Sequence, residues 1–122
     1  LDERYAIDRS RVFLVGHSMG AMQGFAQVKQ SASTFRAVAL LSGGGSVRRG
    51  KEVEKLPFFI GAGARDFGRS GAKQLHESLR RLEVRSEYHE YEDVEHLAIV
   101  QVALPSVFAF FDAEAKEDRD AR

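Results

Sequence analysis

Short, continuously apolar stretches recur along the chain, separated by segments of mixed polarity. Three of them, residues 11–16, 35–43 and 57–64, are dominated by aliphatic and phenylalanine side chains. Strands that are covered on both faces of a parallel sheet show this continuous pattern. A fourth stretch, residues 85–92, alternates and carries several charges, as a half-solvated edge strand does. The pattern therefore predicts four strands, three buried on both faces and one half exposed.

Helical periodicity occupies the segments between and after these strands. Residues 19–29 are rich in small side chains, and residues 70–83 repeat apolar side chains every three or four positions. A last helix is predicted after His96 and towards Lys116, with Pro105 as a break or a first turn within it. Alternation of strands and helices predicts an α/β fold: a parallel sheet of about four strands with flanking helices.

Composition narrows the classes of function. A length of 122 residues suits one domain, and 18 basic against 18 acidic residues leave no field that favours nucleic acid or an anionic membrane. Cysteine is absent, so disulfides and thiolate metal sites are excluded. No apolar run approaches the roughly 20 residues of a membrane-spanning helix. Because the chain begins at Leu1, we expect part of a longer protein, and the cellular compartment is unknown.

The segment GHSMG, which follows the first predicted strand, fits the pattern Gly-x-Ser-x-Gly. In this pattern a strand turns sharply into a helix with the serine at the strained apex, and glycines two residues away avoid collisions. We therefore expect a positive φ and a nucleophilic hydroxyl at Ser18, with Gly16 and Gly20 as the glycines of the turn. The alternative is a glycine-rich turn with an unreactive serine, as in nucleotide-binding folds, but no Walker or Gly-x-Gly-x-x-Gly pattern is present.

A serine hydroxyl needs a base, and the base needs an orienting carboxylate. On a parallel sheet such groups lie just beyond the carboxyl ends of strands, in the chain order serine, acid, histidine. Asp66 directly follows the third predicted strand and is the candidate acid. An aspartate that only caps the next helix is the alternative. Asp93 competes, but it follows the fourth strand, where the histidine is expected.

Four histidines are candidates for the base. His17 precedes Ser18 and cannot easily face its own neighbour's hydroxyl, while His76 lies in a charged helix and His89 within the fourth strand. His96 follows that strand in a loop that opens a helix, and we favour it as the base. The acidic residues around the last two histidines could suggest a metal site, but the spacing fits no metalloprotease histidine pattern, so no metal is expected.

Four segments resemble the α/β-hydrolase superfamily and together cover nearly the whole chain: ERYAIDRSRVFLVGHSMGA, FRAVALLSGGG, PFFIGAGARDFG and YEDVEHLAIV. The resemblance is to esterase, polyhydroxybutyrate-depolymerase-like and dienelactone-hydrolase-like serine hydrolases, including prolyl-oligopeptidase-like peptidases. It implies that Ser18 is the nucleophile, Asp66 the acid and His96 the base. It also implies that the backbone N–H of Met19 is one oxyanion donor.

The same resemblance implies a C-terminal half of the fold, in which residues 1–122 form a partial domain and the first four strands and a second oxyanion donor precede them. The implied reaction is cleavage of a small or polymeric carboxylic ester through an acyl-enzyme, without cofactor, metal or nucleic acid. A peptidase of the same fold and a catalytically silent binding module are the alternatives. Without the earlier strands, residues 11–16, with only Arg11 as a charge at the start, would form an exposed edge, and we expect self-association through it.

Overall fold

The computed structural model describes residues 12–31, 35–44, 53 and 55–121. Four parallel strands form one sheet in the order β1-β2-β3-β4, which confirms the predicted α/β class and its parallel sheet. The elements follow one another as β1 (Phe13–His17), α1 (Met19–Ser31), β2 (Ala37–Leu41), β3 (Phe58–Gly63), α2 (Arg69–Arg81), β4 (Ser86–Tyr91) and α3 (Ile99–Ala121). The strands lie inside the predicted segments, except that β1 extends one residue further, to His17.

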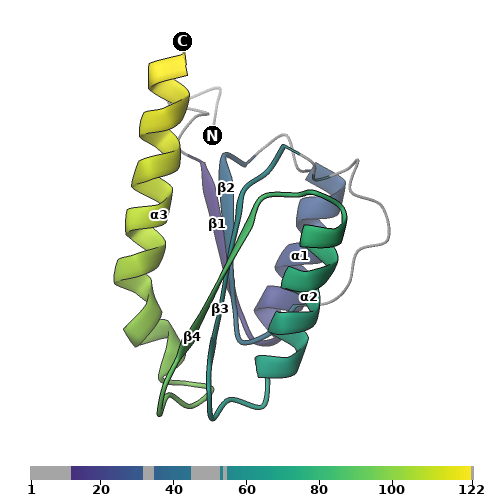
Figure 1. Cartoon of the computed structure of the whole chain (residues 1–122), viewed down its shortest axis with the longest axis vertical. Coiled ribbons are helices and arrows are strands. Elements are labelled where there is room, and N and C mark those ends of the chain that lie inside the picture. Colours follow the sequence, from purple (N-terminus) through teal and green to yellow (C-terminus); the bar gives the residue numbers. More distant parts are fainter. Residues whose placement is uncertain (1–11, 32–34, 45–52, 54, 122) are drawn as a thin grey trace, which may run out of the picture.

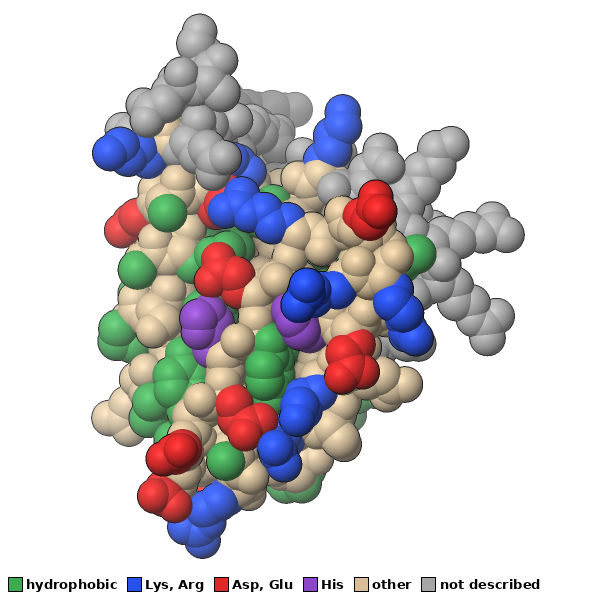
Figure 2. Space-filling model, in the orientation of Figure 1, with side chains coloured by type: hydrophobic (Ala, Val, Ile, Leu, Met, Phe, Trp, Pro, Cys, Tyr) green, Lys and Arg blue, Asp and Glu red, His purple; other side chains and the backbone are tan. Residues whose placement is uncertain are grey.

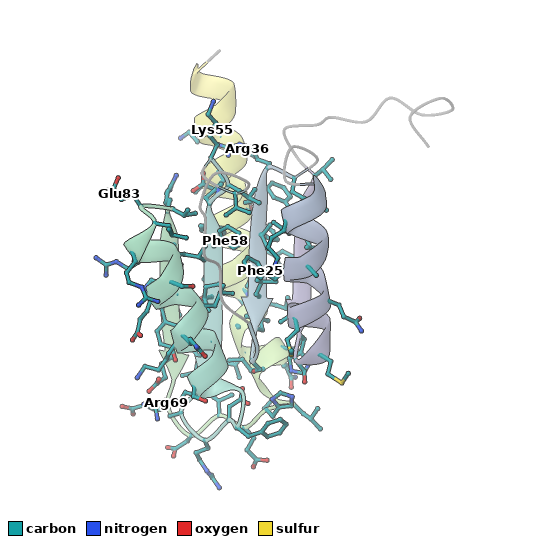
Figure 3. All side chains as sticks on the ribbon, turned by 90° about the vertical axis from the view of Figure 1, so that its right-hand side faces the viewer. Phe25, Arg36, Lys55, Phe58, Arg69 and Glu83 are labelled. Carbon is teal, nitrogen blue, oxygen red and sulfur yellow. The ribbon has the colours of Figure 1, made fainter. Side chains whose placement is uncertain are left out.

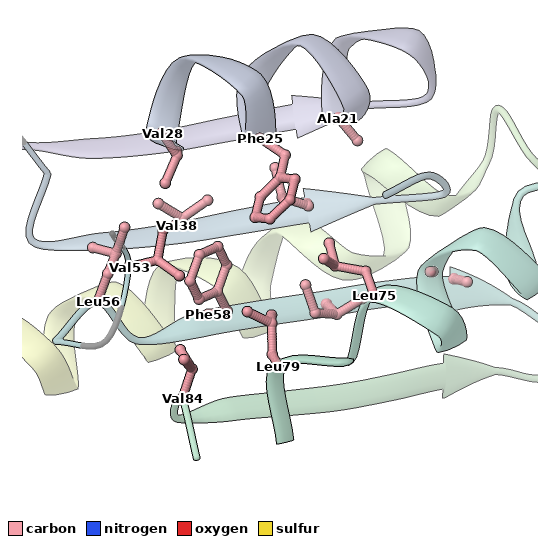
Figure 4. Packing of buried hydrophobic residues seen from close by; sticks show 14 residues of the cluster. Ala21, Phe25, Val28, Val38, Val53, Leu56, Phe58, Leu75, Leu79 and Val84 are labelled. Atoms are coloured by element: carbon pink, nitrogen blue, oxygen red, sulfur yellow. The ribbon is translucent and has the colours of Figure 1, made fainter. Parts of the chain in front are cut away.

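The molecule has three layers, with α3 on one face of the sheet and α1 and α2 on the other (Figure 1). On the side of α1 and α2, the ring of Phe25 meets the edge of Phe58, with 6.1 Å between centroids (Figures 3 and 4). On the side of α3, Phe59 packs against Phe110, with 5.7 Å between centroids. Because β2 and β3 are covered on both faces, every residue in them is buried, as their continuous apolar pattern predicts.

The two outer strands are less covered. Strand β4 has no fully buried residue, with Glu87 and Glu90 exposed and the other four residues half-buried, and charges of both signs are interspersed on the face of the molecule around it (Figure 2). The continuous apolar pattern of β1 predicts burial on both faces, and this is wrong, because Val15 is 43% exposed. The reason is that β1, among the described residues, pairs only with β2 and so lies at the other end of the sheet. The other expectation, an exposed edge here in the absence of the earlier strands, agrees with the place of β1 in the described sheet.

The last helix is continuous, so the predicted break or first turn at Pro105 is wrong: α3 begins at Ile99 and runs through this proline. Ala103 and Val107, on either side of it, are buried in the apolar cluster against the sheet. Pro105 and Gln101 are both exposed, so the Gln101 carbonyl that loses its usual N–H partner lies on the outer side. Packing of the inner face thus keeps one helix where the local sequence favours two.

Candidate active site

The carboxyl ends of the four strands meet at one edge of the sheet, and each is followed by a polar side chain. Ser18 follows β1, Ser42 follows β2, Asp66 lies three residues after β3, and His96 lies in the loop between β4 and α3. Parallel strands bring these positions together although the chain separates Ser18 from His96 by 78 residues. The sheet topology, rather than any local contact, therefore assembles this cluster.

Ser18 forms the turn between β1 and α1, with a φ of 61°. Its backbone N–H donates to the Leu41 carbonyl at 2.9 Å, and its own carbonyl accepts the Ala21 N–H at 2.9 Å. A Cβ at Gly16 would lie 2.7 Å from the Gly20 carbonyl oxygen, so only glycine allows the strand and helix to meet this closely. The turn is thus held by hydrogen bonds to the neighbouring strand and to the following helix.

The other glycine of the motif behaves differently. A Cβ at Gly20 would meet no other atom within 4 Å, so the expectation that this glycine avoids a collision is wrong in this structure. Gly20 lies on the exposed side of α1, whereas Gly16 is buried between strand and helix. The steric requirement therefore rests on Gly16. Met19, whose backbone N–H was the expected oxyanion donor, is the first residue of α1, and no carbonyl of the helix can accept that N–H.

Ser18, His96 and Asp66 form a hydrogen-bonded chain. The distance from Ser18 Oγ to His96 Nε2 is 2.6 Å, and that from His96 Nδ1 to Asp66 Oδ1 is also 2.6 Å. An ionised carboxylate only accepts hydrogen bonds, so Nδ1 carries the proton and Nε2 of the neutral imidazole accepts from the serine hydroxyl. A hydroxyl–imidazole–carboxylate chain of this kind can move a proton from serine to imidazole as the serine oxygen attacks an electrophile.

The Asp66 carboxylate is inaccessible to solvent and is held on both oxygens. The Gly68 backbone N–H donates to Oδ1 at 2.7 Å, and the Ser42 hydroxyl donates to Oδ2. Burial raises the pKa of this carboxyl, but the hydrogen bonds from Ser42, Gly68 and His96 outweigh burial and hold the pKa below its usual 3.8. Asp66 therefore stays ionised, and its bond to Gly68 also forms a local turn before α2.

Ser42 is a site residue that the sequence analysis did not select. It is 2% exposed and has a φ of 61°, an unusual backbone conformation for a residue other than glycine. A Cβ at Gly68 would overlap the Ser42 carbonyl, so the two loops pack backbone against backbone. The available signal was its position: a serine directly after a buried strand, in the same edge of the sheet as Ser18 and Asp66.

Two further contacts orient His96. The His17 ring donates from Nε2 to the His96 carbonyl oxygen at 2.8 Å. The histidine of the GHSMG segment thus helps to hold the loop between β4 and α3. The ring of Phe67 stacks on the His96 imidazole with centroids 3.9 Å apart and 27° between planes. Phe67 is 82% exposed, so this aromatic side chain covers the imidazole while its own outer surface faces solvent.

The competing candidates lie elsewhere. Asp93 is exposed, His76 bonds to the Ser86 hydroxyl at 2.7 Å, and His89 bonds to Glu87 at 3.0 Å while it stacks on Phe59. Within the described part of the chain, no group of three or more His, Asp or Glu residues could hold a metal ion. None of the helices described is long and apolar enough to cross a membrane.

Several solved structures that share this fold are named as esterases. A ferulic acid esterase superposes with a TM-score of 0.77 at 14% identity, over 93% of this chain and 56% of its own. Arabidopsis thaliana SOBER1 gives 0.74 at 20% identity, over 93% of this chain and 57% of its own. A thermostable esterase gives 0.69 at 24% identity, over 76% of this chain and 25% of its own.

The chain thus spans little more than half of the first two structures and a quarter of the third. No family model matches the sequence, and no curated protein matches it. The fold is that of an α/β-hydrolase-like fragment, which confirms at the level of the fold the resemblance found in the sequence. The similarity lies in the arrangement of the backbone, because the identities are low.

Proposed function

We propose that residues 1–122 carry the catalytic residues of a serine hydrolase that cleaves carboxylic esters, in a domain of which they form the C-terminal part. The observation that carries this proposal is the hydrogen-bonded chain from Ser18 through His96 to Asp66, with Ser18 at a positive φ between a strand and a helix. The structural neighbours that are named as esterases support the ester as substrate class.

In this proposal Ser18 Oγ attacks the carbonyl carbon of the ester while His96 Nε2 takes the hydroxyl proton. The imidazolium, stabilised by ionised Asp66, then gives this proton to the leaving alcohol as the acyl–oxygen bond breaks. Water attacks the acyl-enzyme by the same route and releases the acid and free Ser18. The N–H of Met19, at the positive end of α1, donates to the oxyanion.

A fluorophosphonate probe tests the proposal. We expect covalent labelling of Ser18, located by mass spectrometry, and loss of labelling in the variants Ser18→Ala and His96→Gln. Ser106→Ala, which changes an exposed serine on α3, is the matched control and should label as the wild type does. Absence of labelling in a wild-type chain whose circular dichroism shows it folded would contradict the proposal and favour a silent binding module.

The leaving group is tested separately. A short-chain nitrophenyl ester and a peptide nitroanilide release related chromophores, so their turnover by the same preparation can be compared directly. We expect hydrolysis of the ester and little of the anilide, because the structural neighbours are named as esterases. Preferential cleavage of the anilide would replace the esterase proposal with a peptidase of the same fold.

A further inference from the structure

Two cavities open on either side of the pair Ser18 and His96. One, of about 320 Å³, is lined by Ser18 and not by His96. The other, of about 580 Å³, is lined by His96 and not by Ser18. Phe67, whose ring stacks on the His96 imidazole, borders both. The two halves of a bound ester would therefore occupy different surroundings.

The lining of the two cavities differs in charge. The cavity at Ser18 is bordered by thioether, aromatic and glycine groups, with Gln74 as its largest polar side chain, and none of its described lining residues is charged. The cavity at His96 includes Arg65 and Glu95 in its wall. An uncharged, largely apolar wall favours an apolar group, because a charge placed there loses hydration and gains no partner.

The direction of proton transfer decides which half of the ester lies where. During acylation His96 Nε2 donates to the leaving oxygen, so the alcohol must lie on the side of His96. The acyl group stays on Ser18 after the alcohol has left. It points away from the imidazole, towards the cavity that Ser18 lines and His96 does not.

We propose that this cavity, which we call the acyl cavity, binds a short, uncharged, apolar acyl group, and that Gly71 sets its depth; this rests on the proposed function. The volume of the acyl cavity, about 320 Å³, lies near the lower limit for ligand pockets, whose volumes are about 300–1,000 Å³. Met19 and Met22 border it and are 71% and 58% exposed, so their flexible thioethers are free to pack on an acyl chain.

Gly71 lies in the first turn of α2 and borders the acyl cavity. A Cβ at this position would meet no other atom within 4 Å, so the first atom of a larger side chain fits without displacing its neighbours. Gly71→Leu should therefore fill the cavity and leave the fold intact. Ser70→Leu is the matched control, because Ser70 precedes it in the same turn, is exposed and does not border the cavity.

Binding can be measured without catalysis, because the chain has only two methionines and both border the cavity. With ¹³C-methyl methionine, titration with hexanamide should shift the signals of Met19 and Met22 in the wild type and in Ser18→Ala. The shifts should persist in Ser70→Leu and disappear in Gly71→Leu. Methyl signals that stay unshifted, or that shift equally in Gly71→Leu, would overturn the proposal whether or not Ser18 reacts with a phosphonate.

A second variant tests the chemical class of the acyl group. Met22→Lys places a cation beside the cavity at an exposed position of α1. The wild type should bind hexanamide and not succinamate, whose carboxylate has no partner there, and Met22→Lys should bind succinamate, read from the Met19 methyl signal. Equal binding of both amides by the wild type would show that the cavity does not select an apolar group.

Kinetics link the cavity to the reaction. Gly71→Leu should lower kcat/KM for a hexanoate ester by roughly 10- to 200-fold, the discrimination that one methylene gives in an apolar pocket, and should lower it less for an acetate ester. Ser70→Leu, outside the cavity, should turn over both esters as the wild type does. Equal losses for both esters would mean that the cavity does not hold the acyl chain. If the methyl signals shift but no ester is turned over, the proposed function fails while the cavity remains an apolar binding site.

Discussion

At the scale of single residues, Asp66 is the most connected group of the site. Its two oxygens accept from a histidine ring, a backbone N–H and the Ser42 hydroxyl, and its side chain is fully buried. A buried carboxylate without these donors would be neutralised, and a neutral acid would not orient or stabilise an imidazolium. Ser42 is therefore as much a part of the candidate site as the three residues named from the sequence.

Loss of the Ser42 hydroxyl should weaken the site more than the fold. Ser42→Ala and Ser42→Gly both remove the donor to Asp66 Oδ2, whereas glycine also relieves the positive φ. A hydrogen bond to a charged group contributes about 1.5–3 kcal/mol, so we expect ester turnover to fall in both variants, by tenfold or more. Unfolding by denaturant should show Ser42→Gly more stable than Ser42→Ala.

Ser78→Ala serves as the control for Ser42, because Ser78 is a buried serine whose hydroxyl donates to the Leu75 carbonyl, away from the site. Its stability should fall and its turnover should not. Removal of the donor should also raise the pKa of Asp66, so the stability that the ionised carboxylate contributes should be lost at a higher pH on acidification than in the wild type. A Ser42→Gly chain with wild-type turnover and a wild-type loss of stability on acidification would refute this role.

Acid stability should report the same carboxylate. Because the folded pKa of Asp66 lies below 3.8, its ionised form contributes stability that is fully present above pH 3.8 and is lost as pH falls through the folded pKa. The unfolding free energies of the wild type and Asp66→Asn should therefore differ most above pH 3.8 and converge below it. Asp112→Asn, at an exposed position of α3, controls for the loss of one negative charge. A difference that grows on acidification would contradict the assignment.

At the scale of elements, the turn from β1 into α1 depends on one close approach. Gly16 lies against the Gly20 carbonyl, whereas Gly20 itself borders open space. The symmetric pattern Gly-x-Ser-x-Gly thus contains two glycines with different physical requirements in this structure. Packing of one face also accounts for the continuity of α3. Ala103 and Val107 are buried against the sheet on either side of Pro105, and this burial keeps a single helix.

Alanine at the two glycines should have opposite effects. Gly16→Ala brings a Cβ to 2.7 Å from a backbone oxygen, which cannot move without shifting the helix, so stability should fall by about 1–3 kcal/mol. Gly20→Ala adds a Cβ in open space within α1 and should stabilise by up to about 1 kcal/mol through helix propensity. Thermal unfolding of the two variants measures this; equal losses would show that both positions are sterically closed.

At the scale of the whole molecule, the sheet has two unequal edges. Strand β4 carries Glu87 and Glu90 at exposed positions, and charges of this kind discourage pairing with another sheet. Strand β1 has no charged side chain between Phe13 and Gly16, and Val15 is 43% exposed. In the part of the chain that the structure describes, β1 therefore offers a free, apolar strand.

We expect the chain to self-associate through β1, and Val15→Lys should reduce this. A lysine in the middle of the strand places a charge where a second strand would pair, while the partly exposed position tolerates the change. Light scattering at high micromolar concentration should show larger species for the wild type than for Val15→Lys. Glu87→Lys, at an exposed position on the opposite edge, is the control and should scatter as the wild type does. A monomeric wild type would exclude this contact.

Much of the fold follows from local patterns. Strands β2 and β3 are apolar at every position because both of their faces are covered, so their segments were recognisable without any partner. Asp66 and His96 were selected by their positions after strands, and those positions come together because parallel strands end at one edge. The exposure of β1 did not follow from its own pattern, because exposure depends on which strands lie beside it.

The sequence by itself determined the order of strands and helices, the turn at Ser18 and the residue types that follow each strand, since these depend on short stretches of side chains. Only the tertiary structure decided which of those residues touch. The Ser42 hydroxyl reaches Asp66 across 24 residues of chain, and the His17 ring reaches the His96 carbonyl across 79. Such contacts are set by the register of neighbouring strands and by backbone packing between loops, which no local pattern encodes.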